Sequence, residues 1–500
     1  MTRSIHKLRV TRSLAFAIFF IGGAILACSG RQGFREGDPL LTSDGGEPDA
    51  APPACGLHCS RDLKQILDGC EGAETVVATC NADQGCGGGR CVDACTAAVL
   101  TKGSAGCDFW TVAPIDDDQS GGCFAVLIAN TWDRAVSLDA EYGSNTLDIS
   151  RSTYRVEGSG ESSTHIPLEG PLPPGQVAVV FLAHNPSVPG VHPCPPDVTV
   201  AVPLETVQRT TMKKPGFRIK TDAPVSAYSI APYGGARSYT PTATLLLPVS
   251  SWTTSYIAVA PYRFSRNNVG VVPTPRTLQI VAAEDDTEIH MRPTSAITPG
   301  PGVEGAQAGE IRTWTLAKGE VLQIVQHLPL TGSPITTSKP VGVFGGAKVI
   351  NLPYEAGWGD WLQQQIPPLS HWGTEYAVVP YVSRVESLSG NSRELIPYTI
   401  VAAADGTMLT YEPSRPRDAP EALGAGEAAH FVTDEFFVVK SQDTSHPFHV
   451  NVYMTGGATG SGTSSFPSGN AAIQADRVAR AWPGPPRIGD SGAVQVANEC

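Results

Sequence analysis

Short apolar runs separated by glycine, proline and aspartate turns fill the chain between residues 109 and 457. Two of these runs, 277–283 and 398–404, are each followed by an aspartate-containing turn and a second apolar run. Short apolar segments bounded by turn residues are typical of β-strands, and two of them around an Asp-Asp or Asp-Gly turn predict a hairpin. The pattern therefore predicts an all-β body.

One motif of this body occurs more than once. The recurring residues are Pro248, Trp252 and Tyr256 in one copy, Pro368, Trp372 and Tyr376 in the next, and a weaker echo at Phe109, Trp110 and Pro114. Recurrence at one position favours packing in the core of each copy. The alternative is that Trp252 and Trp372 form an exposed face on which a ligand stacks.

The ends of the copies also match. A glycine turn precedes a strand in each, at Gly175, Gly319 and Gly426. A proline follows, which we expect at the start of an alternating strand, where its missing N–H costs no ladder bond. These prolines are Pro224, Pro340 and Pro447.

About six strands per copy suit a small two-sheet sandwich. We therefore expect three tandem β-sandwich-like units at 109–247, 248–367 and 368–457, with a β-propeller as the alternative architecture. A short helical turn is expected at 359–363, and a low-complexity tail, interpreted as a point where the sequence is truncated, at 458–500.

Composition narrows the partner class. The 500 residues carry a net charge of -13, and charged residues make up 17% of the chain. Binding to a phosphate backbone requires a basic stripe, and the sequence contains none. We therefore expect no nucleic-acid partner.

The first 27 residues have the pattern of a secretion signal, with basic residues before an apolar run that is short for a membrane span. The run ends Ile25-Leu26-Ala27-Cys28, which resembles a bacterial lipobox and implies a lipid on Cys28. Ser29 after the cysteine favours the outer membrane. An ordinary signal peptide with a chance cysteine is the alternative. Residues 28–54 have the composition of a flexible tether.

A cysteine-rich segment at 55–108 follows the tether. Nine cysteines within and just after it predict a disulfide framework in an exported protein; they are Cys55, Cys59, Cys70, Cys80, Cys86, Cys91, Cys95, Cys107 and Cys123. Zinc is the rival interpretation, weakened because His58 is the segment's one histidine and no Cys-x-x-Cys pair occurs. Counting Cys194 and Cys500 leaves an odd number of thiols after Cys28, and the sequence does not determine the pairing.

The block Gln-Gln-Ile-Pro-Pro-Leu-Ser-His-Trp-Gly-Thr-Glu-Tyr at 364–376, with Gly345-Gly346 and the 245–248 block before it, resembles the N-terminal domain family of IgG Fc-binding protein. The resemblance covers about 109–457, and bacterial members often carry a lipoprotein signal and a Cys-rich module. It implies an extracellular binding or adhesion module without catalytic residues. It does not by itself imply antibody binding.

Other chemistry has weak support. Gly489-Asp490-Ser491-Gly492 matches the nucleophile segment of trypsin-like proteases, but no matching histidine segment precedes it. His446 and His449 are candidate ligands on one strand, although repeat position favours a structural role. The acidic runs 116–118 and 284–286 lack the spacing of a calcium loop and are expected to be solvated turns.

These observations favour a non-enzymatic, exported and lipid-anchored protein with no cofactor, which binds an extracellular protein or glycan. Two alternatives stay open: a secreted hydrolase that uses Ser491, and a structural spacer at the cell surface without a dedicated ligand.

Overall fold

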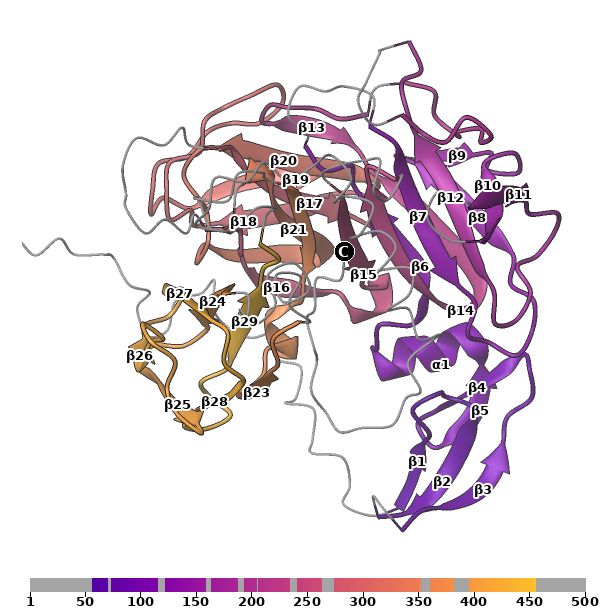
Figure 1. Ribbon diagram of the computed structural model, residues 1–500, viewed down its shortest axis with the longest axis horizontal. Coiled ribbons are helices and arrows are strands. Elements are labelled where there is room, and N and C mark those ends of the chain that lie inside the picture. Colours follow the sequence, from indigo (N-terminus) through magenta and orange to yellow (C-terminus); the bar gives the residue numbers. More distant parts are fainter. Residues whose placement is uncertain are drawn as a thin grey trace, which may run out of the picture.

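The computed structural model describes residues 56–70, 73–115, 122–158, 163–187, 193–204, 206–233, 241–262, 274–350, 352, 360–381 and 395–455. Strands dominate this part of the chain, and α1 (Ala94–Thr101) is its α-helix. The prediction of an all-β protein built from sandwich-like repeats behind a disulfide-rich module is confirmed (Figure 1). The described strands form open and bent sheets and do not close into a propeller.

The N-terminal module is held together by small sheets and disulfides. Three antiparallel strands form one sheet and two more form a ribbon: β1 (Gly56–Cys59), β2 (Gln65–Gly69) and β3 (Thr75–Thr79), then β4 (Gln84–Gly87) and β5 (Arg90–Asp93). Helix α1 follows β5 directly. Asp93 caps the helix by accepting a hydrogen bond from the Thr96 N–H at 3.0 Å. Lys102, in the left-handed conformation, ends the helix.

Unit 1 comprises the strands from β6 to β14. Their bounds are β6 (Gly106–Thr111), β7 (Phe124–Ala129), β8 (Leu138–Tyr142), β9 (Asn145–Leu147), β10 (Thr153–Glu157), β11 (Thr164–Pro167), β12 (Val177–Ala183), β13 (Met212–Pro215) and β14 (Phe217–Ala231). Strand β7 pairs with β12 and with the second half of β14. Strands β6 and β8 pair with the first half of β14.

Unit 2 repeats this plan. Its strands are β16 (Thr253–Ile257), β17 (Arg276–Ala282), β18 (Thr287–Met291), β19 (Arg312–Leu316), β20 (Glu320–Gln326) and β21 (Pro334–Ile350). Strand β17 lies between β20 and the second half of β21, and β16 and β18 pair with the first half of β21.

Unit 3 has the same plan with the long strand divided in two. Its strands are β23 (Glu375–Val378), β24 (Ile396–Ala402), β25 (Thr407–Glu412), β26 (Ala422–Leu423), β27 (Ala428–Thr433), β28 (Phe437–Ser441) and β29 (Phe448–Val452). The sheets β27-β24-β29 and β23-β28-β25-β26 are separate and enclose a core that contains Tyr398, Phe431 and Phe437.

The hairpins expected at the aspartate turns are wrong. Strand β17 does not pair with β18, nor β24 with β25. All seven residues of β17 and of β24 are buried. Strand β17 lies between β20 and β21, and β24 lies between β27 and β29. The aspartate turn after each strand carries the chain across to the facing sheet.

One of the three expected proline positions is right and two are wrong. Pro447 directly precedes β29. Pro224 and Pro340, however, lie inside β14 and β21, where the pairing register shifts as the strand passes from one sheet to the other. The physical reason is the same as at a strand start, since no ladder bond is needed from a residue at the bend.

The helical turn expected at 359–363 is also wrong, because β22 (Asp360–Ile366) is a strand that pairs with the second half of β21. Strand β15 (Thr242–Leu246) pairs with the second half of β14 in the same way. These two link strands each lead into a short 3₁₀ turn, Val249–Ser251 and Leu369–His371, and then into the first strand of the next unit.

The units pack in series, with unit 2 between units 1 and 3 (Figure 1). Strand β13 leaves unit 1 to pair with β20 of unit 2, from Met212↔Gln323 to Pro215↔Glu320. The core of unit 1 continues into unit 2 through Trp252, Phe344 and Trp361. Units 1 and 2 therefore share both a sheet and a core.

Candidate functional site

The recurring tryptophans are structural in this fold. Trp252 and Trp372 are 5% and 6% exposed, so neither presents a face for stacking. Each indole N–H donates to the carbonyl five residues earlier, Leu247 O at 3.0 Å and Pro367 O at 3.2 Å. The interaction fastens the link strand to the start of the next unit.

The recurring tyrosines close the same units. The Tyr256 hydroxyl donates to Val341 O at 2.6 Å, and the Tyr376 hydroxyl donates to Phe448 O at 2.8 Å. Each hydroxyl also accepts a backbone N–H, from Thr253 at 3.3 Å and from Gly373 at 2.8 Å. Burial raises the pKa of Tyr376 to about 12, which keeps the proton on the donating hydroxyl. We call the paired tryptophan and tyrosine of units 2 and 3 the Trp–Tyr clamp.

Disulfide bonds are present where the cysteine-rich pattern predicts them. The described bonds are Cys59–Cys86, Cys80–Cys91, Cys95–Cys107 and Cys123–Cys194, and Cys70 is also disulfide-bonded. The Cys95–Cys107 bond joins α1 to β6, so it ties the module to unit 1. Cys28, Cys55 and Cys500 lie outside the described residues.

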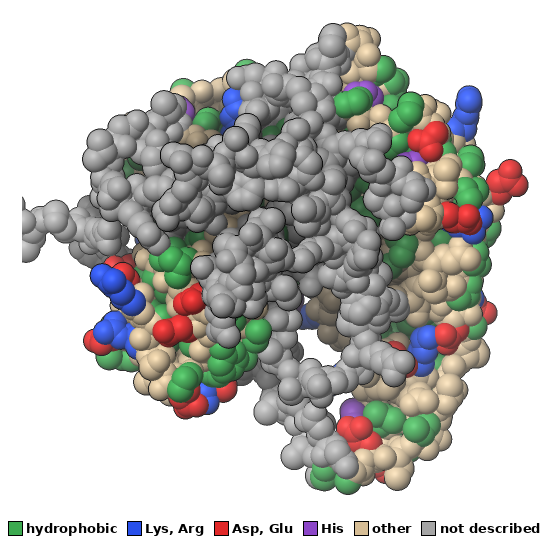
Figure 2. Space-filling model, in the orientation of Figure 1, with side chains coloured by type: hydrophobic (Ala, Val, Ile, Leu, Met, Phe, Trp, Pro, Cys, Tyr) green, Lys and Arg blue, Asp and Glu red, His purple; other side chains and the backbone are tan. Residues whose placement is uncertain are grey.

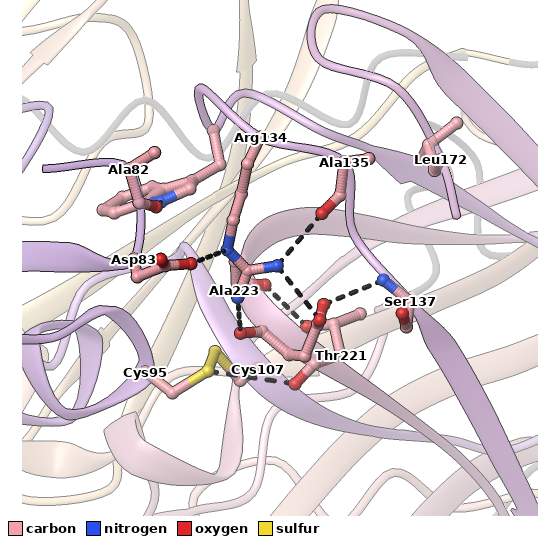
Figure 3. A network of polar contacts seen from close by, with 12 residues as sticks. Ala82, Asp83, Cys95, Cys107, Arg134, Ala135, Ser137, Leu172, Thr221 and Ala223 are labelled. Carbon is pink, nitrogen blue, oxygen red and sulfur yellow. Dashed lines mark hydrogen bonds and ion pairs between the residues drawn. A yellow bond between two sulfur atoms is a disulfide. The ribbon is translucent and has the colours of Figure 1, made fainter. Parts of the chain in front are cut away.

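A polar cluster reinforces this junction (Figure 3). The Arg134 guanidinium lies 3.0 Å from a carboxylate oxygen of Asp83 in the module and 3.0 Å from one of Asp222 in β14. Asp222 also accepts the Ser137 N–H at 2.8 Å, and the Trp132 indole N–H donates to Ala82 O at 2.7 Å. Both carboxylates are well exposed, so the orientation of the module depends mainly on the disulfide and on Trp132.

Three buried glutamines join units 1 and 2. Gln279 and Gln323 are fully buried and Gln363 is 4% exposed. The Gln363 amide donates to Gln279 Oε1 at 2.7 Å and to Val112 O at 3.1 Å. The Gln279 amide donates to Gln323 Oε1 at 2.8 Å and to Ala113 O at 3.1 Å. This glutamine cluster donates hydrogen bonds to the buried carbonyls of Val112 and Ala113, and Lys214 Nζ donates a second one to Ala113 O at 3.1 Å.

Two histidines lie at the junction of units 2 and 3. His449, 2% exposed, stacks on Trp372 with ring centroids 5.2 Å apart. His430 stacks on Tyr262 at 3.7 Å and hydrogen-bonds through Nδ1 to the Thr399 hydroxyl at 2.8 Å. Burial lowers the pKa of each histidine to about 4, so both are neutral at physiological pH.

A small cavity of about 20 Å³ lies at the same junction, enough for about one water molecule. Its lining includes Val259, Ala260, Gln363, His449 and Asn451. His446, the other candidate ligand, is apart from it and bonds Asp443 at 2.7 Å. A site of this size cannot hold a substrate.

The acidic turn 284–286 is solvent-exposed, and Asp285 accepts the Lys318 N–H at 2.9 Å. Within the described ranges, no group of three or more His, Cys, Asp or Glu side chains could hold a metal ion. Residues 116–118 and the Ser491 segment fall outside those ranges. Figure 2 shows acidic and basic side chains interspersed around unit 3, without a patch of one sign on that part of the view.

Comparison with known proteins gives a partial assignment. Residues 242–476 match the family described as IgGFc binding protein. The match runs past 457, where the resemblance was expected to fade, and it leaves out unit 1. The common strand plan nevertheless extends the repeat to unit 1, since β7, β17 and β24 have equivalent partners.

The IgGFc-binding match is supported by one curated relative. The human IgGFc-binding protein is 28% identical over 168 residues, which cover 34% of this chain and 3% of the human protein. The chain thus spans a small fraction of that relative. No solved structure matches the chain, and no helix in the described part is long and apolar enough to cross a membrane.

The glutamine cluster was missed from the sequence, although a signal exists. Gln279 interrupts an apolar run, Leu278-Gln279-Ile280-Val281, and Gln323 interrupts Val321-Leu322-Gln323-Ile324. A glutamine in the middle of a fully apolar strand needs a buried partner. Two such glutamines in neighbouring strands are therefore expected to hydrogen-bond to each other.

Proposed function

We propose that this protein is a non-catalytic binding or adhesion module at the cell surface, with an extracellular protein or glycan as its partner. The match of residues 242–476 to the IgGFc binding family carries the proposal. The human relative is named for binding IgGFc. The cavity at the junction of units 2 and 3 has room for about one water molecule, which supports recognition on an outer surface.

The proposed organisation is a signal peptide at 1–27, a tether at 28–54, a disulfide module at 55–108, β units at 109–247, 248–367 and 368–457, and a tail at 458–500. Fusion of units 1 and 2 through β13 and the glutamine cluster supports a rigid display of the binding surface.

The lipid anchor on Cys28 is tested by mass spectrometry of the mature protein. We expect an N-terminal Cys28 that carries acyl chains, and loss of membrane association in Cys28→Ser. An intact Met1 terminus in the cell extract would rule out the signal and the anchor together.

Partner binding is tested with the Cys28→Ser chain on an array of glycans and extracellular proteins, with purified IgG Fc as one arm. The proposal expects one reproducible partner that the reduced and unfolded chain does not bind. Absence of any selective ligand would favour the spacer alternative. A hydrolytic activity that Ser491→Ala removes would instead favour the hydrolase.

A further inference from the structure

The last strand of unit 3 has an edge that is covered in the other two units. In unit 1 the second half of β14 pairs with β15, from Ala227↔Leu246 to Ala231↔Thr242. In unit 2 the second half of β21 pairs with β22, from Val343↔Ile366 to Ile350↔Asp360. Strand β29 is the corresponding strand, yet within the described residues it ends the sheet β27-β24-β29.

The correspondence of these edges is residue by residue. Val225, Val341 and Phe448 each pair with a residue at the start of their own unit, which is Gly106, Thr253 and Gly373 respectively. Two residues later, Ala227 and Val343 begin to pair with a link strand. Val450 holds this position in unit 3.

The backbone of β29 is oriented to accept a strand there. The Phe448 N–H donates to Gly373 O at 2.9 Å on one side, and the Tyr453 N–H donates to Pro397 O at 3.0 Å on the β24 side. Successive residues of a strand direct their N–H groups to opposite edges, so those of Val450 and Val452 face away from β24. Val450 is 4% exposed, and a buried backbone edge needs hydrogen-bond partners.

The cavity at the junction of units 2 and 3 also points to a link strand that pairs with β29. At the junction of units 1 and 2, Gln363 of link strand β22 donates to Val112 O. Val259 is the counterpart of Val112 in the repeat, and it lines the cavity together with Asn451. The Asn451 side-chain Nδ2 is buried and has no hydrogen-bond acceptor among the described residues.

We propose that residues 470–476 of this chain add to β29 as an antiparallel strand and complete unit 3. The family match continues to residue 476, well beyond β29. In such a strand Ala471, Ile473 and Ala475 would share one face, and the other face would carry Asn470, Ala472, Gln474 and Asp476. Trp482 follows Asp476 by six residues, the same spacing as from Leu246 to Trp252 and from Ile366 to Trp372.

The test is hydrogen exchange of single amides in the full chain, comparing the parent with Ile473→Pro and Gln474→Pro. Two adjacent prolines are needed because neighbouring N–H groups face opposite edges, so one of the two variants removes a ladder bond in either register. Ala493→Pro is the matched control outside the segment. We expect the Val450 and Val452 amides to exchange at least about tenfold faster in one proline variant and unchanged in the control.

A peptide of residues 468–480 added to the affected variant should restore protection. Fast exchange of Val450 and Val452 in the parent would overturn the proposal, as would protection that neither proline alters. Protection that grows with protein concentration, together with a dimer in sedimentation, would assign the edge to a second copy of the chain instead.

Discussion

At the scale of single residues, one tryptophan and one tyrosine hold the start of unit 2, and their counterparts hold the start of unit 3. Trp252 and Trp372 occupy the same place in successive units and make the same hydrogen bond five residues back. The sequence could not show that Tyr256 and Tyr376 bond the last strand of their unit, because Val341 and Phe448 lie more than 70 residues away. A periodic pattern reports which residues are buried and not what they touch.

The Trp–Tyr clamp predicts matched losses of stability. Trp372→Ala should lower the free energy of unfolding of its unit by about 3 to 5 kcal/mol, because it empties a packed site. Tyr376→Phe should cost about 1 to 3 kcal/mol, since Phe448 O and the Gly373 N–H lose their partner. Urea unfolding measures both changes.

Phe436→Leu is the control, because that ring is half exposed. If Trp372→Ala kept its unfolding midpoint and lost binding to a ligand found on the array, the tryptophan would be a stacking platform and the clamp would be wrong.

At the scale of elements, the sequence predicted where strands lie better than how they pair. The runs around 277–283 and 398–404 are strands β17 and β24, as expected. Their partners, β20, β21, β27 and β29, come later in the chain, so adjacency in sequence misled the hairpin prediction. The interrupted periodicity around Pro224 and Pro340 likewise marked a bend inside one strand rather than the start of another.

Two equivalent glycine turns allow the cost of a positive φ to be measured separately from the cost of a steric clash. Gly175 and Gly319 have φ of 71° and 75° at equivalent turns. A Cβ on Gly175 would meet nothing within 4 Å, whereas one on Gly319 would lie 2.4 Å from Gly143 O. Gly175→Ala should therefore cost about 1 to 2 kcal/mol. Gly319→Ala should cost about 1 to 3 kcal/mol more.

Chemical denaturation of the two alanine variants measures the difference. Equal losses would mean that unit 1 and unit 2 separate freely at the Gly143–Gly319 contact, contrary to the shared core.

At the scale of the whole molecule, the contacts that unite the parts are those the sequence revealed least. The Cys123–Cys194 bond spans 71 residues, and strand β13 pairs in a different unit from its chain neighbours. Long-range pairing of this kind leaves no local pattern. The glutamine cluster is the exception, because a polar residue in an apolar strand is visible before its partner is known.

The junction of units 2 and 3 should make stability depend on pH. His430 and His449 have folded-state pKa values of about 4, against about 6.5 when unfolded. Between these values the unfolded chain binds more protons, so the free energy of unfolding falls as pH falls from 6.5 towards 4. At pH 5 each histidine should remove about 2 kcal/mol relative to neutral pH.

Urea midpoints of the parent, His449→Leu and the control Phe436→Leu between pH 7.5 and 5 test this dependence. Removing His449 should flatten the profile, because in the described part of the chain its ring meets Trp372 and Asn451 and no carboxylate that could stabilise its charged form. Phe436→Leu changes a half-exposed ring and no titratable group, so it should leave the slope in this range unchanged. A His449→Leu profile as steep as that of the parent would show that the junction opens to water before the histidine is protonated, and that units 2 and 3 separate without unfolding.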